Sequence, residues 1–223
     1  MQKFATPAPI SVVLDIPAGR IQLIAADRPD TTVEIRPADA ARSRDAEAAE
    51  QIEVAYDDGV LRIGAPEARN RILGHRGAVE ITVQVPAGSR VQARAADAEL
   101  RGVGRLGDVT YEAARGPVKL DETATARLTV QAGDITLGRL TGPAEITTQK
   151  GDIRVTEAAR GTVTLHTRYG DIAVGATRGT SASLNAGTAH GRISNTLRNT
   201  EGEAATLAVH ATTGHGDITA RGL

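Results

Sequence analysis

The amino-acid sequence has 223 residues, a formal net charge of −1, 24 glycines and no cysteine. The lack of cysteine excludes disulfide bonds, thiolate metal ligands and a cysteine nucleophile. The small net charge provides no general attraction to nucleic acid. No apolar run has the length of a signal peptide or a membrane span, so the expected location is the cytoplasm. Aromatic residues make up 2% of the chain, which predicts a core built in thin layers from Ala, Val, Ile and Leu.

Residues 1–85 are predicted to form an N-terminal capping region of short antiparallel strands. Polar and apolar side chains alternate there in six segments: 10–16, 20–25, 32–36, 51–56, 60–64 and 79–85. The sequence Tyr56-Asp57-Asp58-Gly59-Val60 predicts a hairpin, since Asp-Gly adopts the positive φ that such turns need. Residues 39–50, rich in alanine and alternating charge, predict the only helix. The first edge of a stack of coils is exposed, and this region is suited to cover it.

Residues 86–223 contain a hidden repeat. The phrase Gly-Asp-Ile recurs at residues 133–135, 151–153, 170–172 and 216–218, and weaker copies begin at 96, 116 and 191. The intervals between copies run from 17 to 25 residues. Around each copy apolar side chains occupy alternate positions and mostly polar or small ones lie between them. Alternation of inward and outward side chains with a period of two residues is typical of strands rather than of helices.

The pattern predicts an all-β fold, a β-solenoid of about seven stacked coils over residues 86–223. Each coil would bury its inner face only by stacking on its neighbours. Ile135, Ile153 and Ile172 are expected to form one inner column. Four threonines share a second position, at which their hydroxyls can bond along the stack: Thr148, Thr167, Thr188 and Thr213.

Gly102-Val103-Gly104-Arg105-Leu106-Gly107 matches the dinucleotide-binding pattern G-x-G-x-x-G. That pattern binds pyrophosphate where it follows a strand and opens a helix, whereas here residues 108–112 alternate like a strand. We therefore interpret it as a glycine turn between two coils, and no cofactor is expected.

Asp134, Asp152 and Asp171 occupy one position in successive coils and should stack about 5 Å apart. A row of carboxylates can bind Ca²⁺, but the sequence lacks the nine-residue glycine-rich repeat of the calcium-binding β-roll. The favoured interpretation is that each aspartate bonds its own turn backbone. A cation on this column remains the alternative.

His190 and His215 share another position and are expected to be neighbours, while His166 and His210 should face outward. Two histidines without a third ligand make a weak zinc site, so no metal site is assigned. No catalytic residue is assigned either, because the sequence has no G-x-S-x-G, H-E-x-x-H or P-loop pattern.

Four arginines recur near the other turn of the coil: Arg105, Arg139, Arg160 and Arg178. A basic stripe there could meet phosphates or an acidic partner. Their differing offsets from the repeat favour a simpler role in solubility and edge protection.

The coil from Val209 to Ala220 is the last in the sequence, and no charged strand or helix is predicted to cover it. An uncovered coil offers free N–H and C=O groups and the side of an apolar core. We therefore expect self-association through it, as a two-fold dimer or as short head-to-tail oligomers. The candidate edge residues are Val209, Ala211, Thr213, Ile218 and Ala220. Alternatively, the polar loop 195–206 folds across this end and blocks pairing.

Four stretches carry a resemblance to a known family: Val85-Pro86-Ala87-Gly88-Ser89, then residues 167–172, 190–197 and 213–218. Through them the chain resembles a bacterial β-strand-repeat family of unknown function, labelled candidate adhesins. The resemblance implies a β-helical stack. The adhesin label is an analogy from fold, and fold does not fix function.

The leading hypothesis is a non-catalytic scaffold or protein-interaction module that presents flat solenoid faces to a protein partner or to a second copy of itself. The alternative is a carbohydrate- or surface-binding adhesin, which exposed aromatic platforms would favour. The third is a polysaccharide-active β-helix enzyme, which needs polar residues converging in a groove. The outward carboxylates of Glu99, Glu112 and Glu145 lie on different coils. We expect no nucleic acid and no integral membrane segment among the partners.

Overall fold

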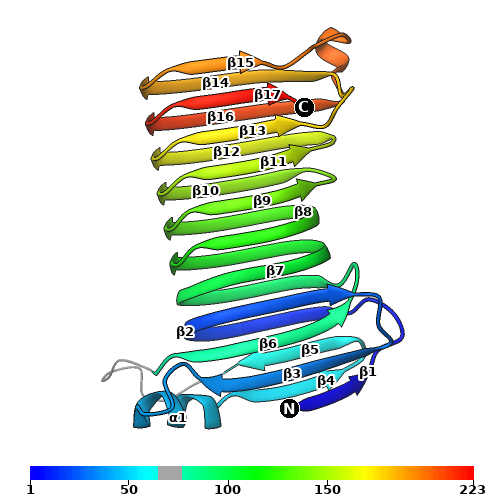
Figure 1. The fold of residues 1–223 in the computed structure, drawn as a ribbon, viewed down its shortest axis with the longest axis vertical. Helices are drawn as coiled ribbons and strands as arrows, with labels where there is room; N and C mark the ends of the chain where they lie inside the picture. The colour runs from blue at the N-terminus through cyan, green and yellow to red at the C-terminus, as the bar shows by residue number, and fades with distance from the viewer. Residues whose placement is uncertain (65–76) are drawn as a thin grey trace.

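The computed structural model describes residues 1–64 and 77–223, which form an elongated stack of β-coils (Figure 1). Within these residues the strands make one 17-stranded sheet that winds around the stack. The predicted all-β solenoid is confirmed. The strands are β1 Gln2–Ala5, β2 Ser11–Ala26, β3 Asp30–Pro37, β4 Glu53–Asp57, β5 Val60–Gly64, β6 Val79–Pro86, β7 Arg90–Arg115, β8 Val118–Ala132, β9 Ile135–Leu140, β10 Ala144–Lys150, β11 Ile153–Ala158, β12 Gly161–Tyr169, β13 Ile172–Ala176, β14 Ala182–His190, β15 Ile193–Thr196, β16 Leu207–His215 and β17 Ile218–Gly222.

The alternation of side chains along each strand sets the core. Ile153 lies in register between Ile135 and Ile172, with the three side chains at most 1% exposed, so the predicted inner column is confirmed. The neighbour of Ile153 in the chain, Arg154, points outward and is exposed. Tyr111 is the one aromatic side chain fully buried among the described residues, and its hydroxyl donates to the carbonyl of Ala98 at 2.8 Å. Burial of the phenol raises its pKa.

The N-terminal region differs from the prediction in one respect. Antiparallel pairing is found between β1 and β3, β3 and β6, and β4 and β5. The prediction is wrong for β2, which runs parallel to β7 from Ser11 to Ala25 and so forms a coil of the stack. On its other side β2 pairs with β5 and β6. Gly19, at φ +127°, lies in the middle of this strand, where a Cβ would come within 1.9 Å of the Val79 carbonyl oxygen.

The local elements of this region follow the sequence signals. Asp58 and Gly59 have φ values of 45° and 75°, and the strands they join are the predicted hairpin β4–β5. The helix α1, Ser43–Glu50, lies inside the predicted range 39–50. The Asp45 carboxylate accepts the backbone N–H of Ala78 at 2.9 Å and ties α1 to the segment before β6. No helix in the described residues is both long and apolar enough to cross a membrane.

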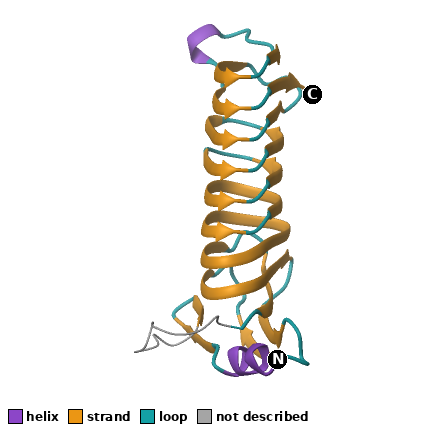
Figure 2. Ribbon diagram, turned by 90° about the vertical axis from the view of Figure 1, so that its left-hand side faces the viewer, coloured by secondary structure: helices purple, strands orange, loops and turns teal. Residues whose placement is uncertain are grey.

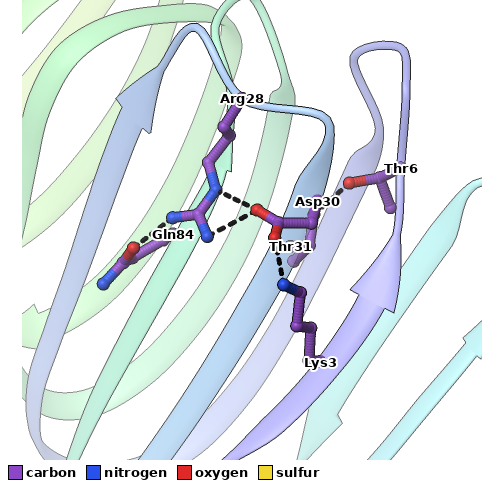
Figure 3. Close-up of polar contacts among 6 residues, drawn as sticks. All are labelled: Lys3, Thr6, Arg28, Asp30, Thr31 and Gln84. Atoms are coloured by element: carbon purple, nitrogen blue, oxygen red, sulfur yellow. Dashed lines mark hydrogen bonds and ion pairs between the residues drawn. The ribbon is translucent and has the colours of Figure 1, made fainter.

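An ion-pair network joins the strands of the N-terminal end (Figure 3). The Asp30 carboxylate contacts the ammonium of Lys3 at 2.7 Å and the guanidinium of Arg28 at 2.6 Å. Arg28 also donates to the side chain of Gln84. Hydrogen bonds from Lys3 and then from Arg28 lower the pKa of Asp30, because they favour its charged form.

Candidate functional site

The aspartates at the turns form a hydrogen-bonded ladder between coils. The Oδ1 atom of Asp134 accepts the backbone N–H of Asp152 at 2.9 Å, and Asp152 accepts that of Asp171 at 2.8 Å. Asp171 then accepts from Asp217 at 2.7 Å, and Asp217 accepts from Arg192 at 2.8 Å. The expected stacking is confirmed. The expected bond to the aspartate's own turn is wrong, because each carboxylate reaches the next coil instead.

The threonine column bonds along the stack as expected. The hydroxyls of Thr148, Thr167, Thr213 and Thr188 donate to carbonyls of turn glycines in the neighbouring coil, at 2.9 to 3.4 Å. Those turns are tightly packed, since a Cβ on Gly170 would lie 2.1 Å from the carbonyl oxygen of Gly151. The polar side chains of both columns therefore hold the coils together.

The last two coils stack in the opposite order to the sequence (Figure 1). β16 pairs in parallel with β12 on one side and β14 on the other. β17 lies in the same way between β13 and β15. The expectation that this coil forms an open edge is wrong, because the later coil is inserted beneath the earlier one. Its candidate edge residues are interior and at most 2% exposed: Val209, Ala211, Thr213, Ile218 and Ala220.

The turn ladder gives a physical reason for this order. A coil with aspartate at the turn offers a carboxylate to the next coil, as Asp217 does to the N–H of Arg192. The coil β14–β15 has Arg192 at that position and offers no carboxylate, so the aspartate ladder ends there. Its inner position Asn195 is polar and exposed, which also suits a terminal coil. The two signals were present in the sequence, at Gly191-Arg192 and at Asn195.

The open end of the stack is therefore β14–β15. Among the described residues each of these strands pairs on one side only. β14 contains no Asp, Glu, Lys or Arg over its nine residues. On β15 the side chain of Ile193 is 46% exposed.

The loop that follows β15 covers part of this end. The backbone carbonyl of Arg198 accepts the N–H of Ala182 at 2.9 Å, at the start of β14. The buried Ser181 hydroxyl accepts the N–H groups of Thr200 and Glu201 at 3.1 and 3.2 Å. The short 3₁₀ helix η1, Gly202–Ala204, lies above one side of the stack (Figure 2). The loop thus anchors the start of β14, and its Leu197 packs against the core, but among the described residues it makes no backbone hydrogen bond to the rest of β14.

Three rings stack beside the turn ladder. His190 and His215 are neighbours as expected, with ring centroids 4.6 Å apart. Tyr169 continues the stack 5.0 Å from His215, with the guanidinium of Arg168 5.6 Å from its ring. Tyr169 shares the sequence position just before the turn glycine, so the repeat alignment already contained this signal. The rings face one another along the stack, and His190, on the terminal strand β14, is the last of them.

Two other sequence motifs have structural roles. Gly102–Gly107 lies within β7, and the chain continues as strand rather than opening a helix. Arg105 and Arg139 do not belong to a basic stripe, because Glu122 lies in register between them. Elsewhere Arg160 donates to a backbone carbonyl, that of Thr141, at 3.2 Å. Within the residues described, no group of three or more His, Cys, Asp or Glu side chains could hold a metal ion.

Parallel coils, an inner isoleucine column and glycine–aspartate turns define the molecule as a β-solenoid. The family described as Toastrack DUF4097 matches residues 12–222, and the chain belongs to that family. No curated protein matches the sequence.

Solved structures of bacterial proteins resemble the chain along its whole length. A candidate cell adhesion protein from Clostridium sporogenes is 10% identical, with a TM-score of 0.39 and coverage of 100% of this chain and 98% of the other. A candidate adhesin from Bacteroides fragilis is 13% identical, with a TM-score of 0.43 and coverage of 98% and 95%. One from Parabacteroides merdae is 14% identical, with a TM-score of 0.46 and coverage of 98% and 94%. At these values the similarity carries no conclusion about what this chain binds.

Proposed function

We propose that this protein is a non-catalytic interaction module that binds a second copy of itself through its terminal coil, β14–β15. The polar columns that resemble catalytic or metal-binding groups are engaged in the fold. The aspartates accept backbone N–H groups of neighbouring coils, and the threonines donate to turn carbonyls. Groups held in this way serve stability rather than chemistry.

One observation carries the proposal: the open edge strand β14 has nine residues and no charged side chain. Proteins commonly protect edge strands with charge, with proline or by making them short. The edge strands at the N-terminal end follow this rule, because β4 carries Glu53 and Asp57 and β1 has only four residues. The unprotected strand β14 is thus suited to pair with another strand.

A two-fold dimer is the arrangement that fits this edge. Two copies of β14 would pair antiparallel, each completing the other's hydrogen bonds, and the interface would close on itself. Head-to-tail growth is disfavoured, because the far end of the stack is covered by antiparallel strands and α1. The missing carboxylate at Arg192 also leaves a further parallel coil without its turn acceptor.

The test is the mass of the intact chain by size-exclusion chromatography with light scattering over a range of concentrations. The variant Asn185→Lys/Gly187→Lys places charges on the exposed outer face of β14, and we expect it to be monomeric. The matched control is Thr164→Lys/His166→Lys, which alters the same two positions on β12, a strand paired on both sides. A monomeric intact protein, or a dimer that persists in the β14 variant, would refute the proposal.

A further inference from the structure

A second surface lies on the outer face of β11, β13 and β17. A shallow hollow of about 300 Å³ is lined there by Arg154 and Thr156 from β11, Ala173 and Gly175 from β13, and Thr219 and Arg221 from β17. We propose that this hollow binds an acidic polysaccharide chain through its carboxylate groups. This site is separate from the terminal coil and does not depend on self-association.

The hollow is a fixed consequence of the backbone. β11 and β13 change register between Val155 and Ala158, at a β-bulge. Gly175 lies opposite this bulge, where a Cβ would come within 2.2 Å of the Thr156 carbonyl oxygen. Since no larger residue fits at Gly175, and its neighbour on the face is Ala173, the floor stays low between two long side chains.

The polar side chains around the hollow are two guanidinium groups and two hydroxyls. Within the part of the chain that the structure describes, Arg154 and Arg221 have no carboxylate within 4.0 Å, and the hydroxyls of Thr156 and Thr219 have no side-chain hydrogen bond. On the opposite side of the stack Arg127 is paired with Glu145 at 3.3 Å. Guanidinium groups bind carboxylates in a bidentate manner, so this face favours an anion.

The nearest side-chain carboxylates in the sequence are engaged elsewhere, and Asp217, the one before Arg221, accepts the N–H of Arg192. Asp152 accepts the N–H of Asp171 at the turn, and Glu157 lies 4.0 Å from Arg139 at the other end of the strand. By register, the Cα atoms of Arg154 and Arg221 are two strands and two residues apart, about 12 Å from strand geometry. Two separate anionic groups on one extended chain would span this distance better than a single small ion.

The character of the face favours a polysaccharide over a peptide. Extended peptides usually bind by adding a strand to a free sheet edge. Here β11, β13 and β17 are each paired on both sides, so no main-chain groups are available. The lining has no aromatic side chain, and the one exposed large apolar side chain beside it is that of Leu223, next to Gly175. Hydroxyl and guanidinium groups around a shallow hollow instead match the hydroxyl and carboxylate groups of an acidic polysaccharide.

The test is calorimetric binding of an oligogalacturonate chain to the intact protein, with a neutral dextran of equal length as comparison. We expect oligogalacturonate to bind and dextran not to, and Arg154→Gln/Arg221→Gln to weaken binding by about tenfold or more. Arg127→Gln, on the opposite face, should have less than about a twofold effect. Circular dichroism checks that each variant folds.

Three results would overturn the proposal. They are the absence of oligogalacturonate binding, equal binding of dextran, and equal loss in the double variant and in Arg127→Gln. Binding of poly-glutamate as tight as that of oligogalacturonate would assign the face to acidic peptides and overturn the polysaccharide class. Each binding measurement can also be made with the Asn185→Lys/Gly187→Lys variant. A failure of oligogalacturonate binding is therefore distinct from a failure of the self-association proposal.

Discussion

The stacking order of the last coils predicts unequal effects of one substitution made twice in the same column. Ile218 and Ile193 lie in register on β17 and β15, but Ile218 is fully buried and Ile193 is 46% exposed. Replacing Ile218 by alanine removes about three buried carbon atoms worth roughly 0.8 kcal/mol each, about 2.4 kcal/mol of transfer free energy. The cavity left behind adds to this, so the expected loss is about 2–5 kcal/mol.

For Ile193→Ala only about half of the transfer term applies and no closed cavity forms, so the expected loss is about 1 kcal/mol. The measurement is the free energy of unfolding in urea, followed by circular dichroism, at concentrations where light scattering shows a monomer. Ile172→Ala serves as control, because Ile172 is 1% exposed and pairs with Ile218 from the other side. If Ile193→Ala costs as much as Ile218→Ala, the inserted position of β16–β17 is refuted.

Two further predictions concern the turns and the N-terminal end. Gly170→Ala should lower the free energy of unfolding by about 3 kcal/mol or more, because its Cβ would lie 2.1 Å from the Gly151 carbonyl oxygen. Gly187→Ala has open space around it and should be neutral or slightly stabilising. Similar urea midpoints for the two variants would contradict the packed-turn geometry. The pKa of Asp30 is lowered in the folded protein, so its contribution to stability is present above the unfolded value of about 4 and is lost as pH falls through the folded value. The difference in unfolding free energy between the intact chain and Asp30→Asn should therefore shrink in acid, and a difference that stays constant from neutral to acid pH would contradict this assignment.

The shape of each coil could be predicted from the sequence, but the order of the coils could not be read from periodicity. Alternation determines which side chains point inward, and so the column through Ile135, Ile153 and Ile172 was predictable. The alternation alone does not select which coil lies next to which, because the inner positions of all the coils hold similar apolar side chains. What distinguishes neighbours is a contact between coils, such as the N–H of Arg192 on the carboxylate of Asp217.

The candidate surfaces were harder to predict for the same reason. The open edge of β14 follows from the terminal position of its coil, for which Arg192 and Asn195 were the signals in the sequence. The hollow beside Gly175 follows from a one-residue register shift between β11 and β13, which no single strand reveals. The ring stack was easier to predict from the sequence, since Tyr169, His190 and His215 share one position in the repeat.

The inserted coil also constrains how the chain reaches its final state. During synthesis the coils from β7 to β13 can be added one upon another, each using contacts close in sequence. β14–β15 cannot settle in the same way, because the surface on which it rests is built from β16–β17, which emerges later from the ribosome. β14–β15 therefore reaches its final position only together with β16–β17 or after it. Such a step joins segments that are distant in sequence, and contacts of this kind are slow to form.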